Sequence, residues 1–153
     1  MMMKRPFAKV VVAVACAVLA GTAAADELVK YTVDKDNYSI PEPLTATAGD
    51  AAKGRAAAID RKRGNCLACH TMPVPEQPFH GLIAPPLASV GARYDAGQLR
   101  LRVVDPKALN PNTPMPSFYK DDGIFRPSKQ FAGKPILSAQ EVEDVVAYLL
   151  TLQ

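Results

Sequence analysis

The sequence Cys66-Leu67-Ala68-Cys69-His70 is the most informative part of this 153-residue chain. Cys66 and Cys69 lie at positions i and i+3, which are adjacent on one face of a helical turn, so each thiol can add to one of two neighbouring vinyl groups. His70 follows at once and can place its imidazole beneath the same macrocycle as an iron ligand. This spacing is typical of a c-type haem attachment site and predicts one covalently bound haem.

Two other kinds of site use similar residues. A thioredoxin-like pair of cysteines follows a strand in a βαβ pattern, and the sequence before Cys66 shows no such strand. A zinc site needs four ligands, but beyond residue 25 the chain has only two cysteines and two histidines, with His70 directly adjacent to Cys69. Haem therefore explains these residues better than either alternative.

The opposite face of the iron needs a second ligand, and the candidates beyond residue 25 are Met115, Met72 and His80. Met115 lies between two prolines, whose restricted backbones can hold a thioether in a fixed place. We expect it to be the sixth ligand, which completes a His/Met ligand set. Met72 follows His70 by two residues, a reach of about 7 Å at most, so we expect it to stay on the histidine side and cover the haem edge. His80 is the competing ligand, and we expect it to be a surface or structural histidine.

Further residues are candidates for supporting roles. A ligating histidine donates its other ring nitrogen to a fixed acceptor, and we expect that acceptor to be the carbonyl of Pro85. Arg93, beside Tyr94, is the candidate for binding the haem propionates. The basic run 61–63 can steer an acidic partner, although such runs usually form only a solvated face. No residue is expected to be catalytic, since thioether formation consumes both thiols beyond residue 25.

The first 25 residues have the three parts of a secretory signal peptide. Basic side chains precede an unbroken apolar run over 10–20, and alanines at 23–25 form a small-residue cleavage site before Asp26. A membrane anchor needs about 20 apolar residues, roughly twice this run. The full chain has 18 basic and 15 acidic side chains. Cleavage after Ala25 would remove three basic residues and Cys16, and the balanced charge that remains gives no support to a polyanion-binding role.

The remaining sequence predicts an extended arm at 26–46 and one all-α domain at 47–153. The segments 72–86 and 110–135 are rich in proline, which denies them both helix and central strand. No stretch predicts a strand. Because loops this long around a small core need a central group on which to pack, we expect helices and proline-rich loops wrapped around the one covalent haem.

Three helices are predicted within that domain. Asp50 is a candidate N-cap for a helix over 50–63, and a capping box opens a second helix over 95–104. The last helix has the strongest signals, because Ser138 and Glu141 form a capping box and four apolar residues follow at helical spacing. These four are Val142, Val145, Val146 and Leu149.

Several ordered blocks over 47–152 resemble a known family. They are GNCLACHTMP at 64–73, FHGLIAPPLASVGARYD at 79–95, VVDPKA at 103–108, MPSFY at 115–119 and GKPILSAQEVEDVVAYL at 133–149. The layout resembles monohaem cytochromes c with His/Met ligation, and the blocks together are similar to SoxX, the small haem subunits of the SoxAX cytochromes of bacterial sulfur oxidation. The resemblance implies a small cytochrome c fold whose first and last helices cross, with Gly54 and Tyr148 as the contact pair.

The resemblance also implies partners and an activity. It implies a periplasmic heterodimer with a SoxA-like haem subunit. Such complexes oxidatively join thiosulfate to a cysteine of a SoxYZ-like carrier, an L-cysteine S-thiosulfotransferase reaction, and pass the electrons to a soluble cytochrome c. Within such a complex this chain would be an electron relay without its own catalytic site. The function left open beside it is a free-standing periplasmic electron carrier of the same fold.

Overall fold

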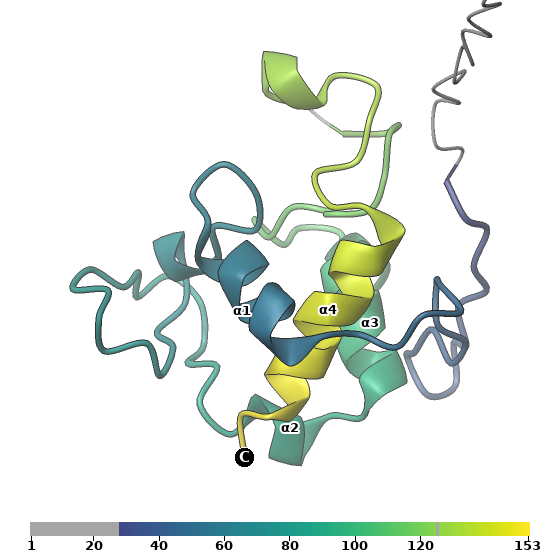
Figure 1. The fold of residues 1–153 in the computed structure, drawn as a ribbon. Helices are drawn as coiled ribbons and strands as arrows, with labels where there is room; N and C mark the ends of the chain where they lie inside the picture. Colours follow the sequence, from purple (N-terminus) through teal and green to yellow (C-terminus); the bar gives the residue numbers. More distant parts are fainter. Residues whose placement is uncertain (1–27, 125) are drawn as a thin grey trace, which may run out of the picture.

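Three helices form the framework of the molecule (Figure 1). Helix α4 lies in the middle and packs against α1 on one side and α3 on the other. The bounds are Ala51–Ile59 for α1, Ala96–Val104 for α3 and Ala139–Leu150 for α4. The loops that join these helices surround this framework.

The computed structural model describes residues 28–124 and 126–153. The signal peptide predicted at 1–25 lies outside these described residues. Within them, β-type pairing is limited to an isolated antiparallel bridge between Asp34 and Ser39. The prediction of an all-α protein is confirmed.

Four shorter helical elements lie within the connections. They are η1 (Cys66–Ala68), α2 (Val90–Arg93), η2 (Pro106–Ala108) and η3 (Lys129–Phe131). The sequence pattern predicts none of the last three, because a helix of one turn has too few residues to show a period and depends on tertiary contacts. In α2, for example, the N–H of Gly91 donates to the carbonyl of Leu152 at 2.8 Å, just beyond α4.

The predicted capping residues begin all three long helices. The side chain of Asp50 accepts hydrogen bonds from two backbone N–H groups in the first turn of α1. Asp95 and Gln98 form a complete capping box at α3, and Ser138 and Glu141 form another at α4. These caps satisfy N–H groups that have no partner inside the helix.

The first helix is shorter than predicted. The expected helix over 50–63 ends at Ile59, and Asp60 has an extended backbone. The carbonyl of Asp60 then accepts the N–H groups of Arg63 and Asn65 at 3.1 and 3.0 Å. The hydrogen bonds of this reverse turn end the helix and bring the cysteine motif back toward α1.

Helices α1 and α4 approach until their backbones touch. A Cβ atom on Gly54 would lie 1.8 Å from the carbonyl oxygen of Asp144 and 2.8 Å from the nitrogen of Val145. Only glycine allows this approach, because any side chain would overlap the main chain of α4. The tightest contact therefore falls on Asp144 and Val145, one turn before the Tyr148 that the family resemblance implies.

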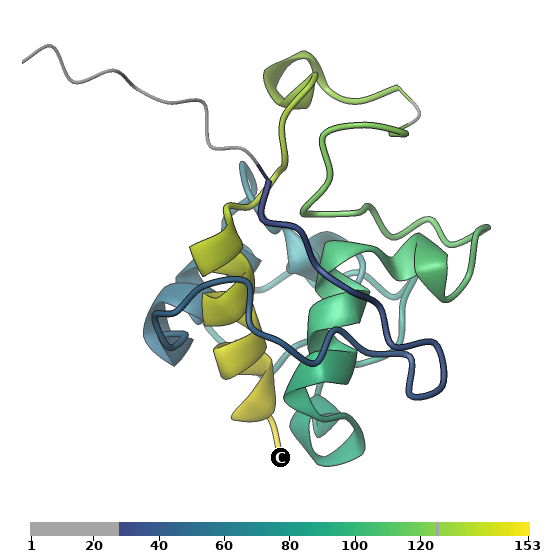
Figure 2. The ribbon, with the colours of Figure 1, turned by 90° about the vertical axis from the view of Figure 1, so that its right-hand side faces the viewer.

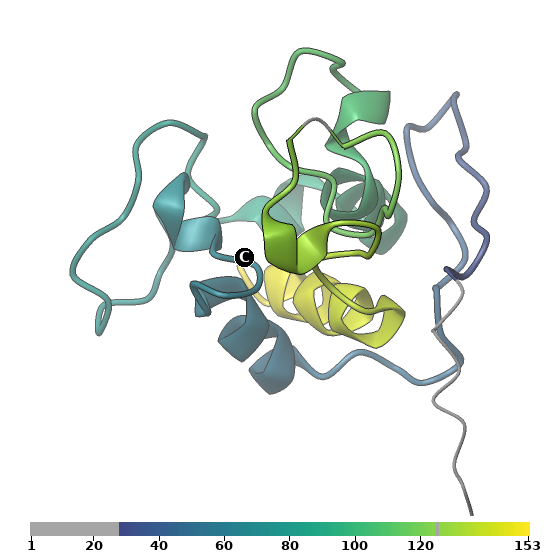
Figure 3. The same ribbon diagram turned by 90° about the horizontal axis from the view of Figure 1, so that it is seen from above.

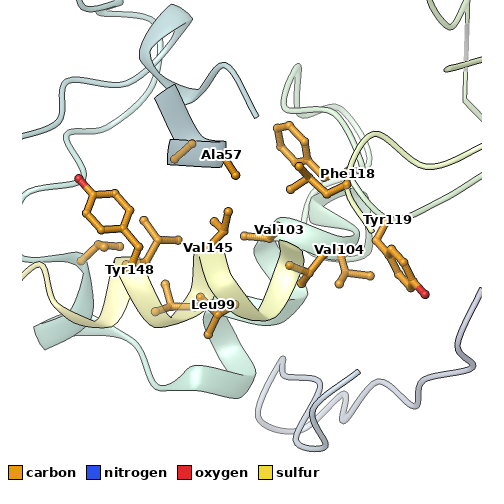
Figure 4. Packing of buried hydrophobic residues seen from close by; sticks show 14 of the residues in the cluster. Ala57, Leu99, Val103, Val104, Phe118, Tyr119, Val145 and Tyr148 are labelled. Atoms are coloured by element: carbon orange, nitrogen blue, oxygen red, sulfur yellow. The ribbon is translucent and has the colours of Figure 1, made fainter. Parts of the chain in front are cut away.

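The core fills the space between the three helices (Figure 4). Figure 4 shows Ala57 of α1, Leu99 and Val103 of α3 and Val145 of α4 around this space. The four apolar residues predicted to form one face of α4 are all buried. Burial of a Val or Leu side chain contributes roughly 1.5–3 kcal/mol, so this face accounts for the position of α4.

The described part of the arm lies across the framework (Figure 2). The N–H of Val29 donates to the hydroxyl of Tyr119 at 2.9 Å. Further along, the N–H of Ile40 donates to the carbonyl of Gly97 in α3 at 3.0 Å. The arm is thus an ordered strap on its own domain.

A buried ion pair fastens the strap between α3 and α4. The guanidinium of Arg100 donates to both carboxylate oxygens of Glu143, at 2.7 and 2.9 Å, and the two side chains are only 4% and 6% exposed. Arg100 also donates to the carbonyl of Ile40 at 2.6 Å, and Glu143 accepts the N–H of Leu44 at 2.8 Å. The pair therefore satisfies the buried backbone of the strap as well as its own charges.

Candidate functional site

The cysteines and the histidine of the motif are held by one tight turn after α1. The N–H groups of Cys69 and His70 both donate to the carbonyl of Cys66, at 3.2 and 2.9 Å. The turn opens at Asn65, whose φ of 48° lies in the left-handed region. The turn keeps the motif within one hydrogen-bonded unit.

The state of the two thiols and the grouping of possible ligands argue against a redox or zinc site. Burial raises the pKa of the Cys66 thiol to about 11, whereas reactive CxxC thiols have a lowered pKa. No group of three or more His, Cys, Asp and Glu residues in the described part of the chain could hold a metal ion. The motif thus lacks the features of both alternatives.

The ring of His70 is oriented by Pro85. Its Nδ1 lies 2.7 Å from the carbonyl oxygen of Pro85, which is the contact expected from the sequence. Because a carbonyl can only accept, Nδ1 carries the proton and Nε2 is the unprotonated nitrogen. His70 is therefore in the tautomer that can ligate a metal through Nε2.

The segment 72–87, here called the proximal loop, folds back onto the motif that precedes it. Its Gly81 N–H donates to the carbonyl of Leu67 at 2.7 Å, and its Ala84 N–H donates to the carbonyl of Cys69 at 3.0 Å. Figure 3 shows this loop as the teal projection beside η1. These hydrogen bonds place Pro85 at His70.

An ion pair joins the proximal loop to the helical framework. Arg55 of α1 bonds the carboxylate of Glu76. The hydrogen bond from Arg55 lowers the pKa of the Glu76 carboxyl. Both side chains are partly exposed, at 36% and 50%, so solvent screens the pair and it adds little to stability.

Arg93 also contacts the proximal loop. Its Nη2 donates to the carbonyl of Pro86 at 3.0 Å, and its guanidinium lies 5.9 Å from the centre of the Tyr94 ring. Arg102 of α3 stacks on that ring at 3.8 Å, a cation–π contact that the sequence analysis missed because no motif marks it. Arg93 thus lies beside the Pro85 segment, and its binding to haem propionates stays a prediction.

Met115 lies in the second proline-rich loop. It is half-buried and packs against the hydrophobic core, and its N–H donates to the hydroxyl of Thr113 at 3.2 Å. Just beyond it, the N–H of Phe118 donates to the carbonyl of Val103 at 3.1 Å. Met115 is therefore held between a local turn and an anchor on α3, while its role as sixth ligand stays a prediction.

The two rival ligands occupy different surroundings. Met72 is only 4% exposed and belongs to the core, and its place at the haem edge stays a prediction. Its N–H donates to Nδ1 of His80 at 3.3 Å, which places the proton of a neutral His80 on Nε2. That Nε2 is buried and has no hydrogen-bond partner among the described residues. His80 is thus a partly buried residue of the proximal loop.

The basic run 61–63 is not a uniform solvated patch. Arg63 forms an ion pair with Glu141, the capping residue of α4. The run therefore contributes a structural contact between the turn after α1 and the start of α4.

The residues described above fit a c-type haem. The chain offers two free thiols, a histidine with Nε2 in the ligating state and a half-buried thioether held on the framework. The hydrogen-bond partner of His70 Nδ1 is a backbone carbonyl and not a charged side chain.

Comparisons with known proteins agree with this geometry. The cytochrome c family model matches residues 51–153. A chain of the solved structure "Crystal structure of SoxXA from P. pantotrophus" is similar, with 39% identity and a TM-score of 0.72 over 80% of this chain and 93% of that chain. No curated protein matches. In the described part of the chain, no helix is long and apolar enough to cross a membrane. The chain belongs to the cytochrome c family, whose members bind a c-type haem covalently, and within it to the SoxX type.

Proposed function

We propose that this chain is the electron-transfer haem subunit of a two-chain cytochrome that oxidatively conjugates thiosulfate to a cysteine of a SoxYZ-like carrier. The partner would be a SoxA-like haem subunit, and the electrons would pass to a soluble cytochrome c. The observation that carries the proposal is the likeness to a SoxXA chain, which extends over 93% of that chain at 39% identity.

The haem-binding roles follow from the site. Cys66 and Cys69 would form the thioethers, and His70 and Met115 would hold the iron on its two faces. When bound, the haem supplies a one-electron redox centre whose potential is raised by His/Met ligation. The contact from Pro85 to His70 fixes the imidazole, and the flanking prolines restrict Met115. A relay of this kind needs ligands that do not move when the charge changes.

The sulfur chemistry falls to the partner. Joining thiosulfate to a thiol forms a sulfur–sulfur bond, releases the thiol proton and removes two electrons. Cys66 and Cys69 are consumed by the thioethers, so neither can carry the substrate sulfur. Because one haem takes one electron at a time, the partner must hold a further redox centre or the transfer must occur in two steps.

Export is part of the same proposal. A signal peptide cleaved after Ala25 would deliver the chain to the periplasm, where c-type haem and the partner would be found together. N-terminal sequencing of the mature protein should begin at Asp26, and a start at Met1 would contradict export by this route.

Affinity purification of the tagged full chain from its own bacterium tests the function. We expect a second haem-bearing chain to co-purify, and the isolated complex to conjugate thiosulfate to a SoxYZ-like carrier with reduction of a soluble cytochrome c. A haem stain of the denatured chain should remain coloured. A lone monomer across a wide concentration range would instead identify a free-standing electron carrier.

A further inference from the structure

We propose that three exposed apolar side chains of the proximal loop form the surface on which the second haem subunit docks. They are Phe79, Leu82 and Ile83, here called the apolar tip. The inference rests on the proposed function, because that function requires a haem-bearing partner. The inference goes beyond that function by naming the face of this chain that the partner covers.

The apolar tip is the largest concentration of exposed apolar side chains in the described residues. Phe79, Leu82 and Ile83 are 82%, 89% and 74% exposed. The other large apolar side chains described as exposed are Val29 and Tyr38, which lie in the arm. Single exposed apolar residues are ordinary, whereas three on one short loop are a candidate interaction surface.

The tip is held in place by the motif itself. Gly81 lies between Phe79 and Leu82, and a Cβ on it would be 2.1 Å from the carbonyl oxygen of Ala68. The N–H groups of Gly81 and Ala84 donate to carbonyls of the motif at 2.7 and 3.0 Å. Because its backbone is fixed before binding, the tip would lose little conformational entropy when a partner covers it.

The tip and the nitrogen that would hold the iron are on different edges of the His70 ring. Pro85, two residues after Ile83, contacts Nδ1 of the histidine. The iron would bind Nε2, on the far edge of the same ring. The backbone that carries the tip is therefore bonded to the Nδ1 edge of the ring, opposite the nitrogen that would hold the iron.

The composition around the tip favours a permanent subunit over a transient partner. From residue 77 to residue 92 the sequence has no Lys, Arg, Asp or Glu. Transient electron-transfer encounters use charge to steer their partners, whereas obligate interfaces are more apolar. The tip also follows the haem-binding cysteines closely, so a haem subunit docked there would lie near the relay. A SoxA-like subunit is the occupant that meets these conditions.

The test uses the haem-loaded full chain and the haem-bearing chain that co-purifies with it. The variant Leu82→Ser with Ile83→Ser should weaken the complex at least tenfold in sedimentation velocity, since the burial of two apolar side chains would be lost. Tyr38→Ser, which removes an exposed apolar side chain from the arm, should leave the affinity unchanged. The haem absorbance of both variants should match the unmodified chain.

The outcomes distinguish a failure of the docking proposal from a failure of the proposed function. If the unmodified chain binds no haem-bearing partner, the proposed function and the tip both fail. If it binds one and the double variant binds equally well, the tip is overturned while the function stands. Self-association of this chain through the tip, without a second subunit, would also overturn it.

A photo-crosslinking amino acid covers the case in which the double variant folds poorly or changes its haem absorbance. Placed at position 82 in the otherwise unmodified chain, it should crosslink to the partner, and at position 38 it should not. Crosslinking from position 38 alone would show that the partner docks on the arm face and would overturn the tip.

Discussion

The helical framework and the loops that carry the haem residues are stabilised in different ways. In the framework, Gly54 brings two helix backbones into contact, and Arg100 and Glu143 form a buried, fully hydrogen-bonded ion pair. In the loops, His70 depends on one backbone carbonyl, and Met115 is half-buried beside a single local hydrogen bond. The framework is stabilised by contacts between its own residues, whereas the loops carry the residues that are expected to hold the haem.

This difference predicts that the free energy of unfolding and the haem spectrum respond to different substitutions. Substitutions in the framework should change the free energy of unfolding and leave the haem spectrum intact. Substitutions at the ligands should do the reverse.

Exchange of Met115 should have the largest effect. Met115→Ala should abolish the weak absorbance band near the red end of the visible spectrum that reports an iron–thioether bond. Met72→Ala should retain that band but lower the free energy of unfolding by about 2–5 kcal/mol, because Met72 is a core residue. Visible absorbance and chemical denaturation of the two holoproteins provide the measurements. Loss of the band in Met72→Ala alone would reverse the ligand assignment.

Removing the charge of Glu143 should have the next largest effect. Glu143→Gln leaves the buried guanidinium of Arg100 without its counter-ion, which costs about 3–5 kcal/mol for such pairs. Chemical denaturation followed by circular dichroism measures the loss, and the haem absorbance should not change. Glu42→Gln, an exposed acid of the same strap, is the control and should be neutral. Equal stability of both variants would show that the pair does not fasten the strap.

A methyl group at Gly54 should have an intermediate effect. In Gly54→Ala the added Cβ overlaps the carbonyl of Asp144, and overpacking of this kind costs about 1–3 kcal/mol. This loss exceeds the gain of up to about 1 kcal/mol in helix propensity. Thermal unfolding of the holoprotein measures the balance, with Lys53→Ala on the exposed side of α1 as control. A more stable Gly54→Ala variant would mean that the helices can separate freely.

The ion pair between the two regions should have the smallest effect. Glu76→Gln removes the exposed contact with Arg55, and we expect a change in the denaturation midpoint that high salt eliminates. The pKa of Glu76 is lowered in the folded state from its ordinary 4.5. The pair therefore contributes fully above pH 4.5 and is lost as the pH falls through the lowered value. Denaturation at a series of pH values tests this, and a difference that grows on acidification would contradict the sign.

The sequence predicts the parts of the fold that have local signals. Asp50, Asp95 and Ser138 are capping residues whose short side chains bond the next turn, so they mark helix starts without knowledge of the rest of the chain. The apolar spacing in α4 identifies its buried face for the same reason. The end of α1 at Ile59 is not predictable in this way, because it is set by the turn that Asp60 forms with Arg63 and Asn65.

The residues of the candidate site also divide into those with a local sequence signal and those without one. Cys66, Cys69 and His70 are recognisable because the chemistry of haem attachment dictates their spacing. Burial of Met72, the cation–π contact of Arg102 and the exposed tip at Leu82 depend on segments that meet only after folding. No local pattern in the sequence shows how deeply a methionine is buried.

The sequence alone predicts that the chain is helical, that it binds a haem covalently through the motif at 66–70 and that its helices begin at particular caps. These properties can be predicted from short-range spacing, because caps, thioethers and helix periods involve only a few neighbouring residues. The folded structure is needed to show that the arm is a strap and that Arg100 and Glu143 are buried together. It also shows that Pro85 holds Nδ1 of His70. These depend on the distance between residues remote in sequence, and that distance exists only when the chain is folded.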